Sequence, residues 1–167
     1  DKKVLLIDAD VARPSVSKVL GIDRNLPGLI DYLETEQVNF DNVILKTNIP
    51  GLSIIPAGKL HRRSTELLMS NKMALFAQEL SNRYADRIVI FDSPPLLAAT
   101  QGEVLAGLVG QVILVIEAEK TPQSIVMESV KKLSGCDVVL TLLNKAPDSD
   151  AGVYGYGYGY GYGKYAH

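Results

Sequence analysis

Four short apolar runs, each ending in a polar residue, constrain the fold of this chain more than any other feature. They are rich in β-branched residues and leucine, and polar residues do not alternate within them. That pattern predicts strands covered on both faces, as in a parallel sheet. The runs are 4–7 before Asp8, 87–91 before Asp92, 111–116 before Glu117 and 138–143 before Asn144.

Helical patterns lie between these runs. Alternating strands and helices predict a doubly wound α/β fold, with a mainly parallel sheet, flanking helices and right-handed crossovers. Pro122 is expected at the first position of a helix, and Leu67, Leu68, Leu75 and Phe76 are expected in the core. The remaining expected elements are helices at 15–20, 28–34, 64–84 and 123–133, and a short strand pair at 43–45 and 52–55.

Composition excludes several classes of protein. The chain has 167 residues, the length of one domain, with 47% hydrophobic and 22% charged residues. Its net charge of −2 offers no basic excess for nucleic acid, which we do not expect as a partner. The single cysteine, Cys136, excludes an intrachain disulfide framework, and no apolar run is long enough to span a membrane.

The composition changes near residue 147, where we place a boundary. Residues 1–146 are predicted to form the core, and 147–167 a flexible linker and tail. Six of the eight tyrosines and six of the fourteen glycines lie between 152 and 167. Without other context, this segment is a low-complexity aromatic tail or a fibre-forming strand with one aromatic face.

Aspartates follow two of the apolar runs. Ligands of an open parallel sheet bind at the carboxyl ends of its strands. Asp8 and Asp10 would point the same way from an extended backbone, and nearby carboxylates favour a cation such as Mg²⁺ between them. Arg13 can hold a phosphate or pair with an aspartate. Asp92 ends an apolar strand, the general form of a Walker B element. Taken singly, each aspartate has an alternative role in capping or loop solvation.

Several segments together resemble one family. LLIDADVARP resembles the Walker A-prime motif, and IVIFDSPP the Walker B motif, of bacterial tyrosine kinases, which belong with the MinD- and ParA-like P-loop ATPases. LPGLIDYL, LSIIPAG, TELLMS and LLNKA stand in the order and approximate spacing of that family. The resemblance covers 3–165, nearly the whole chain, and implies a P-loop NTPase-like fold.

The resemblance also implies roles for the acidic residues. Asp8 would be the general base that takes the proton of a substrate tyrosine, with Asp10 and Arg13 beside it in the catalytic group. Asp10 and Asp92 would hold Mg²⁺, partly through water. Asp8 and Asp10 can exchange roles, because both lie within reach of one ion. Phosphoryl transfer requires mainly positioning and charge neutralisation, which such a group supplies.

Asn144 and Lys145 follow the last apolar run. An asparagine at this place contacts the adenine in related ATPases, so the resemblance implies that both residues bind ATP. A strand-end turn with a solvated lysine remains an equal alternative. Glu117 also ends a run, but we interpret it as loop polarity.

The implied function is an ATP- and Mg²⁺-dependent tyrosine autokinase of exopolysaccharide or capsule export. Its expected partners are a membrane polysaccharide co-polymerase or activator segment, further copies in a ring-like homo-oligomer and a cognate tyrosine phosphatase. The expected location is the cytoplasm, at the inner face of the membrane. A neighbouring subunit would phosphorylate the clustered tyrosines. These are Tyr154, Tyr156, Tyr158, Tyr160, Tyr162 and Tyr165.

One family element is missing from the sequence. No G-x-x-x-x-G-K-[ST] motif occurs. We therefore expect the first βα unit to be absent, the sheet to carry an unpaired edge or hydrophobic groove, and these 167 residues to be inactive alone. Two other functions remain open. One is a MinD/ParA-like ATPase without kinase activity, which gives no reason for the clustered tyrosines, and the other is a non-catalytic interaction module.

Two segments depart from the family pattern. Many members have an asparagine-proline pair where this chain has residues 63–65, and an aspartate where it has Gln101. His61, Arg62 and Arg63 form a small basic cluster. We interpret this cluster as solvated surface, with a phosphate or subunit contact as the alternative.

Overall fold

The computed structural model describes residues 2–23, 25–59, 61–84 and 86–147. One or two strands alternate with one to three helices along these residues, which agrees with the predicted α/β class. The elements in chain order are β1 (Lys3–Asp8), α1 (Val16–Val19), α2 (Leu29–Glu34), α3 (Phe40–Val43), β2 (Leu45–Lys46), β3 (Leu52–Ile55), α4 (Ser64–Leu68), α5 (Asn71–Arg83), β4 (Arg87–Asp92), α6 (Thr100–Ala106), β5 (Val112–Glu117), α7 (Gln123–Lys132) and β6 (Val139–Asn144).

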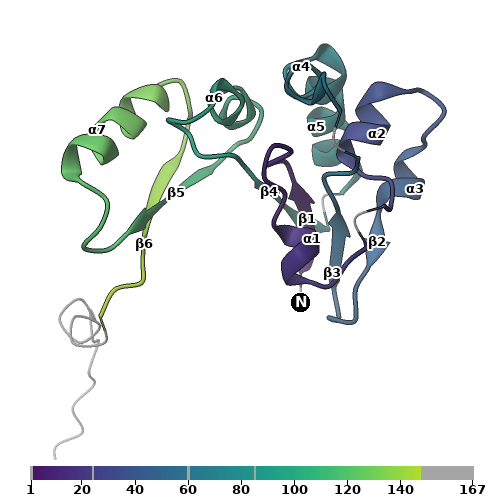
Figure 1. The fold of residues 1–167 in the computed structure, drawn as a ribbon, viewed down its shortest axis with the longest axis horizontal. Coiled ribbons are helices and arrows are strands. Elements are labelled where there is room, and N and C mark those ends of the chain that lie inside the picture. Colours follow the sequence, from purple (N-terminus) through teal and green to yellow (C-terminus); the bar gives the residue numbers. More distant parts are fainter. Residues whose placement is uncertain (1, 24, 60, 85, 148–167) are drawn as a thin grey trace, which may run out of the picture.

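The strands form two sheets. The larger has the order β2-β3-β1-β4, and the smaller pairs β5 with β6. Every pairing is parallel except β2 with β3, so the predicted mainly parallel sheet is confirmed. Figure 1 shows the larger sheet with α2 to α5 on one side of the molecule, and the β5–β6 pair with α7 on the other. Among the described residues β4 pairs only with β1, which leaves the unpaired sheet edge that the sequence predicted.

The core lies on one face of the larger sheet. Leu5 and Ile7 of β1 and Ile55 of β3 are fully buried there, because side chains two positions apart along a strand share a face. Phe76 and Leu80 of α5 pack onto the same cluster. The core of the larger sheet is therefore built around β1, the strand that leads to Asp8.

The opposite face differs from the prediction. We expected all four long strands to be covered on both faces, and only β1 approaches this. On β4, Ile88 and Ile90 are 49% and 46% exposed. An apolar run predicts that a strand is buried, but it does not show which segment covers it. In the smaller sheet, one face of β5 and β6 is covered by no described element. Four side chains form two cross-strand pairs on it, Ile113 with Leu140 and Val115 with Leu142.

The helix expected at 64–84 is two helices. Ser70 leaves helical geometry, with φ −81° and ψ 158°, and its Oγ accepts the Met73 N–H at 3.3 Å. That N-cap begins α5. Leu68 and Phe76 are buried as predicted and Leu67 partly so, whereas Leu75 is 64% exposed and its core assignment was wrong.

Other boundaries differ less. Pro122 is the N-cap of α7 rather than its first helical residue, because its ψ of 145° is extended. Val43 ends α3 instead of beginning a strand, so β2 is shorter than expected. Neither α3 nor α6 was predicted from the sequence. None of the helices in the described ranges has both the length and the apolar character needed to cross a bilayer.

Candidate active site

Two parallel strands bring Asp8 and Asp92 together. These residues are partners in the β1–β4 register, and each ends its strand. Adjacent strands lie roughly 4.8 Å apart, and paired residues share a face. The Ala9 N–H donates to the Asp92 carbonyl at 2.8 Å, which fixes the two strand ends to each other. We predicted from the sequence that Asp8 and Asp92 lie at one rim of the sheet, and in the structure both lie at the carboxyl ends of β1 and β4.

Asp8 is a buried carboxyl group with an incomplete set of partners. Its side chain is 0% exposed, and its Oδ2 accepts the Val16 N–H at 3.2 Å. Its Oδ1 is buried and has no hydrogen-bond partner in the described part of the chain. Burial, with the charges of Asp92 and Asp10 adding to it, raises the pKa of Asp8 to about 6. Buried polar atoms are normally satisfied, so this oxygen indicates a site that accepts a proton, a cation or a donor.

Asp10 and Asp92 complete a coupled acidic group. Burial and then the charge of Asp10 raise the pKa of Asp92. Asp10 is half-buried, and its Oδ1 accepts the Arg13 N–H at 3.1 Å. Asp10 thus destabilises the ionised forms of Asp8 and Asp92, and Asp92 that of Asp8, which a bound cation would reverse.

The donor set fits magnesium better than a metal held by protein alone. Within the described ranges, no group of three or more His, Cys, Asp or Glu side chains is placed to hold a metal ion. Mg²⁺ needs only one or two carboxylates, with waters and phosphate oxygens as its other ligands. Asp10 and Asp92 match that requirement, and the unpartnered Oδ1 of Asp8 lies in the same acidic group.

Arg13 contacts the acidic group through its backbone N–H. Its N–H donates to the side chain and to the carbonyl of Asp10, at 3.1 and 3.2 Å. Its guanidinium is exposed and forms no ion pair with the described aspartates. The predicted pairing with an aspartate is thus not observed, and a phosphate contact stays a prediction.

Asn144 and Lys145 lie in the smaller sheet, at the end of β6, away from the β1–β4 rim. The Nζ of Lys145 is 2.9 Å from Oε1 of Glu117, and this contact and that of Lys120 lower the pKa of Glu117. The sequence had assigned Glu117 to loop polarity, so its ion pair was missed. The structure does not bring this pair to the aspartates. The six predicted phosphorylation sites, from Tyr154 to Tyr165, lie outside the described residues.

Sequence reasoning also missed Asp31. One oxygen of its carboxylate, Oδ2, accepts the N–H of Gly28 at 2.9 Å and that of Lys59 at 3.1 Å. The backbone of Gly58 has φ +85° and passes so close to Gly28 and Asp31 that a Cβ would not fit. The sequence feature that could have indicated this contact is the presence of Gly28 and Gly58 in two otherwise apolar segments, 30 positions apart.

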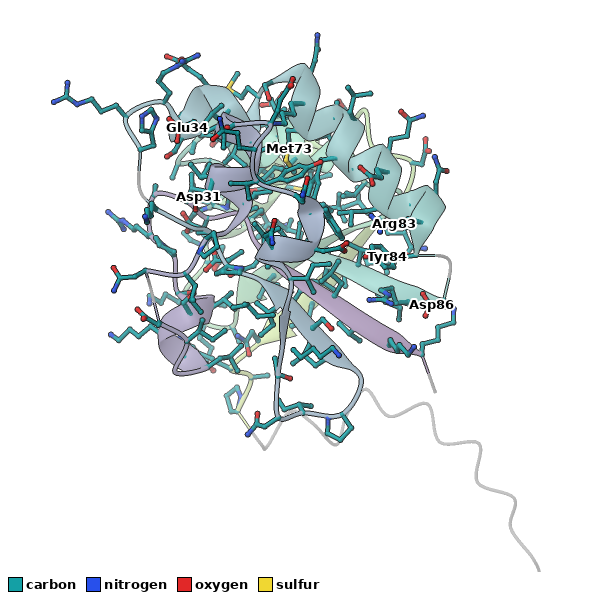
Figure 2. The ribbon with its side chains drawn as sticks, turned by 90° about the vertical axis from the view of Figure 1, so that its right-hand side faces the viewer. Asp31, Glu34, Met73, Arg83, Tyr84 and Asp86 are labelled. Atoms are coloured by element: carbon teal, nitrogen blue, oxygen red, sulfur yellow. The ribbon has the colours of Figure 1, made fainter. Side chains whose placement is uncertain are left out.

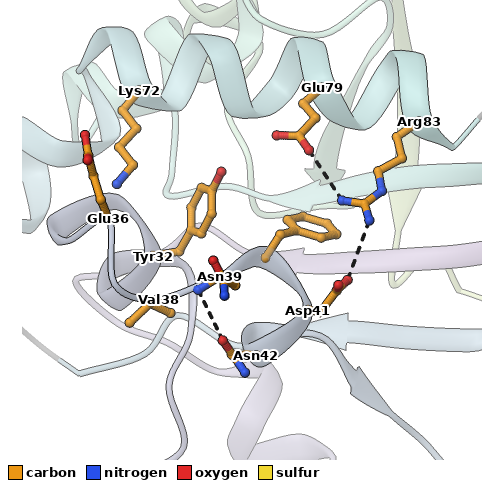
Figure 3. Close-up of a pocket in the computed structure, with 10 residues that line it drawn as sticks. Tyr32, Glu36, Val38, Asn39, Asp41, Asn42, Lys72, Glu79 and Arg83 are labelled. Atoms are coloured by element: carbon orange, nitrogen blue, oxygen red, sulfur yellow. Dashed lines mark hydrogen bonds and ion pairs between the residues drawn. The ribbon is translucent and has the colours of Figure 1, made fainter.

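A separate pocket of about 500 Å³ opens between α2, α3 and α5 (Figure 3). The Nζ of Lys72 lies 5.2 Å from the centre of the Tyr32 ring, and burial raises the pKa of Tyr32, with the charge of Glu79 adding to the effect. Arg83 pairs with Glu79 and Asp41 at 3.4 and 3.8 Å. None of the aspartates of the β1–β4 rim lines this pocket, which belongs to the packing of α5.

Two departures from the family pattern meet in space. Gln101 of α6 donates through Nε2 to Oγ1 of Thr65 in α4, at 2.8 Å. His61 contacts Glu34 at 3.1 Å and Arg63 contacts Glu66 at 3.1 Å, whereas Arg62 is exposed and has no such contact within the described ranges. Arg62 and Arg63 are exposed, as the solvated-surface interpretation requires, but two of the three members of the cluster have acidic partners.

Known proteins resemble this chain in sequence and structure. It is 36% identical to the tyrosine-protein kinase Ptk of Acinetobacter johnsonii over 154 residues. This match covers 91% of this chain and 20% of Ptk. The VpsO kinase domain is 34% identical, with a TM-score of 0.75 over 86% of this chain and 71% of that one. The kinase domain of the Escherichia coli tyrosine kinase ETK is 30% identical, with a TM-score of 0.81 over 96% of this chain and 62% of that one. No family model matches the chain.

More distant structures share only the fold. Cobyrinic acid a,c-diamide synthase of Mycobacterium smegmatis, solved with an ATP analogue and magnesium, has a TM-score of 0.68 at 21% identity. MinD of Pyrococcus horikoshii, solved with Mg-ADP, has a TM-score of 0.62 at 24% identity. The P-loop NTPase-like fold that the motifs predicted is confirmed. This chain spans about a fifth of Ptk, so the comparisons leave open what the rest of such a protein does.

Proposed function

Since the chain belongs to the bacterial tyrosine kinase family, we propose that it forms part of the catalytic core of an ATP- and Mg²⁺-dependent protein-tyrosine kinase. The observation that carries this proposal is the pairing of Asp8 with Asp92 across β1 and β4, with Asp10 electrostatically coupled to both. Each of these residues stands in a motif of that family, and the fold presents them together at the carboxyl ends of the strands.

Asp8 is the proposed general base. With a pKa of about 6 it is mostly ionised at neutral pH, yet it is more basic than an ordinary aspartate. A tyrosine hydroxyl has a pKa of roughly 10, so transfer to Asp8 becomes favourable only as the hydroxyl begins to attack phosphorus. Asp10 and Asp92 are the proposed magnesium ligands, and the bound ion would neutralise charge on the nucleotide phosphates.

The phosphate-binding part of the site is not supplied by these residues. The sequence has no Walker A loop, and the sheet is open between β4 and β5. A further parallel strand that carries such a loop would pair with the free edge of β4, and the helix after the loop would cover Ile88 and Ile90, which are about half exposed. We therefore propose that nucleotide binding requires a segment outside these 167 residues, and that Asn144 and Lys145 reach the nucleotide only in the completed sheet.

The tyrosine-rich segment supports an autokinase. Alternating glycine leaves a backbone free to enter the site of another copy, and each phosphate adds about −1.5 to −2 charge. We propose phosphorylation between subunits of a ring, in exopolysaccharide or capsule export. A membrane polysaccharide co-polymerase is the proposed activator and a tyrosine phosphatase the proposed antagonist, at the inner face of the membrane.

A MinD/ParA-like ATPase without kinase activity is the second candidate. It is favoured by the fold likeness to MinD and uses the same three aspartates. It does not account for six tyrosines in the last 16 residues, between 152 and 167.

Phosphotyrosine formation separates the two functions. The full-length protein is incubated with Mg-ATP, and mass spectrometry maps phosphate on residues 154–165. Asp8→Asn is expected to lower phosphorylation by at least about 100-fold. Asp86→Asn is the matched control, because Asp86 is exposed just before β4 and pairs with Arg87. ATP hydrolysis without phosphotyrosine would favour the ATPase, and equal phosphorylation by Asp8→Asn and the wild type would refute the proposed base.

A further inference from the structure

The loop that follows β3 is fastened to the first turn of α2. The N–H groups of Leu29 and Ile30 donate to the carbonyls of Pro56 and Ala57 at 2.8 and 3.0 Å. In the opposite direction, Asp31 accepts the Lys59 N–H at 3.1 Å. Three hydrogen bonds thus connect residues 56–59 to one helical turn, which fixes the path of the loop.

The continuation of the loop is ordered by a second set of contacts. The Ser64 Oγ donates to the His61 carbonyl at 2.7 Å and accepts the His61 N–H at 3.0 Å. The Arg63 N–H donates to Nδ1 of His61 at 3.2 Å, and Nε2 of the same ring lies 3.1 Å from Glu34 of α2. Residues 61–64 are therefore a compact turn attached to the other end of α2.

Two cations on this loop have no counterion among the residues that the structure describes. Glu34 already contacts His61, and Glu66 already contacts Arg63. Lys59 and Arg62 are exposed, and neither forms an ion pair with a described residue. Because hydrogen bonds hold the backbone of Lys59 and the turn at 61–64, mainly the two charged side chains remain to be ordered when an anion binds.

The loop lies on one particular side of the proposed base. Ile7 and Ile55 are register partners in the parallel β1–β3 pair, so the loop after β3 leaves the same rim as Asp8. Figure 2 shows Asp31 and Glu34 far from Asp86, which precedes β4 and therefore marks the amino ends of the strands, so these two residues of α2 lie towards the carboxyl ends. In the order β3-β1-β4, Asp8 separates the basic loop from the open β4 edge, where the phosphate-binding strand is proposed.

We propose that Lys59 and Arg62 bind acidic side chains of the polypeptide that presents the acceptor tyrosine. The inference rests on the proposed kinase function and adds a class of substrate to it, namely tyrosines with Glu or Asp nearby in sequence. In this chain Asp148 and Asp150 precede the tyrosine cluster and residues 152–167 contain no acidic residue, so Tyr154 is the clustered tyrosine that best fits this class. The nucleotide is not the proposed ligand, since its phosphates belong on the β4 side of Asp8. Asp31 is a positioning residue in this scheme, because it fixes the backbone of Lys59.

Kinetics with two matched peptides test the proposal. One peptide has a single tyrosine flanked by three glutamates, and in the other the glutamates are replaced by glutamine. For the full-length kinase at low salt, KM for the glutamate peptide is expected to be about three- to tenfold lower, with similar kcat. Lys59→Gln with Arg62→Gln should remove that difference and leave KM for ATP unchanged. In the wild type, higher salt should reduce the difference in KM between the two peptides.

The control variant removes the same charge elsewhere. Lys46→Gln with Lys131→Gln changes two exposed lysines on β2 and α7, and the glutamate preference should persist. Equal KM values for the two peptides in the wild type, or a rise in KM for ATP in the Lys59/Arg62 variant, would overturn the inference and leave the kinase function standing. Phosphorylation of neither peptide, by a protein that also forms no phosphotyrosine on itself, would overturn both.

Discussion

The two sheets carry similar apolar sequences but differ in how completely they are packed. β1 lies between β3 and β4, and its Leu5 and Ile7 are fully buried. In β5 and β6, side chains of the same kind, such as Val115 and Leu142, are 59% and 47% exposed. The aspartate group lies at the rim of the packed sheet, whereas Asn144 and Lys145 lie at the rim of the open one. The proposed base and metal ligands are therefore held by the described chain itself, and the proposed nucleotide contacts depend on completion of the sheet.

The largest expected difference between the two sheets is in stability. Phe76→Ala removes a ring that is 1% exposed in the core below the larger sheet, and should lower the free energy of unfolding by about 3–5 kcal/mol. Leu75→Ala, at the adjacent and 64% exposed position, should cost less than about 1 kcal/mol. Urea denaturation followed by circular dichroism measures both. Similar losses for the two variants would mean that α5 does not pack as described.

A second test concerns the cost of the buried Asp8. Its pKa is raised from 3.8 to about 6, so the folded state binds this proton more tightly than the unfolded state does. Stability is then highest below the unfolded pKa and falls as pH rises towards 6, by about 3 kcal/mol in total. Asp8→Asn should unfold at higher urea than the wild type at pH 7, and this advantage should shrink towards pH 4.

Asp86→Asn is the control for that experiment. Asp86 is exposed, and its hydrogen bond and charge contact with Arg87 lower its pKa, so its replacement should give no gain in stability at pH 7. If the difference in free energy of unfolding between the wild type and Asp8→Asn is the same at pH 4 and pH 7, Asp8 ionises freely in the folded protein. A stabilised but inactive Asp8→Asn protein would fit a site that trades stability for function.

A smaller effect is expected in the open sheet. Leu142→Ala should cost about 1 kcal/mol, since roughly half of the side chain is already in contact with water. Ile54→Ala in β3 is the matched position, fully buried, and should cost about 2–5 kcal/mol. Equal costs would indicate that another segment covers the β5–β6 face in solution, and the contrast between the sheets would then disappear.

The sequence predicted what depends on local pattern. The α/β class, the parallel strands and the meeting of Asp8 with Asp92 follow from apolar runs that end in aspartate, because parallel strands deliver their carboxyl ends to one rim. The sequence did not predict which strand faces are exposed. Leu5 and Ile90 both lie in apolar runs, but Leu5 is fully buried and Ile90 is 46% exposed, because their neighbours in space differ. Asp31 was missed for the same reason, because Lys59 is 28 positions away along the chain.

The smallest predicted effect concerns the ion pair at the rim of the open sheet. Lys145 contacts Glu117 at 2.9 Å, and that contact is the first cause of the lowered pKa of Glu117, ahead of Lys120. Lys145→Gln should therefore raise the Glu117 pKa towards the usual value for a glutamate, and Lys120→Gln should raise it less. An NMR titration of the side-chain carboxyl carbons measures both. If Lys145 turns to a nucleotide in the completed kinase, Mg-ATP should produce the same rise in the wild type. A Glu117 pKa unaffected by Mg-ATP would instead assign Lys145 to holding β5 and β6 together, and leave Asn144 as the only nucleotide contact proposed for this sheet.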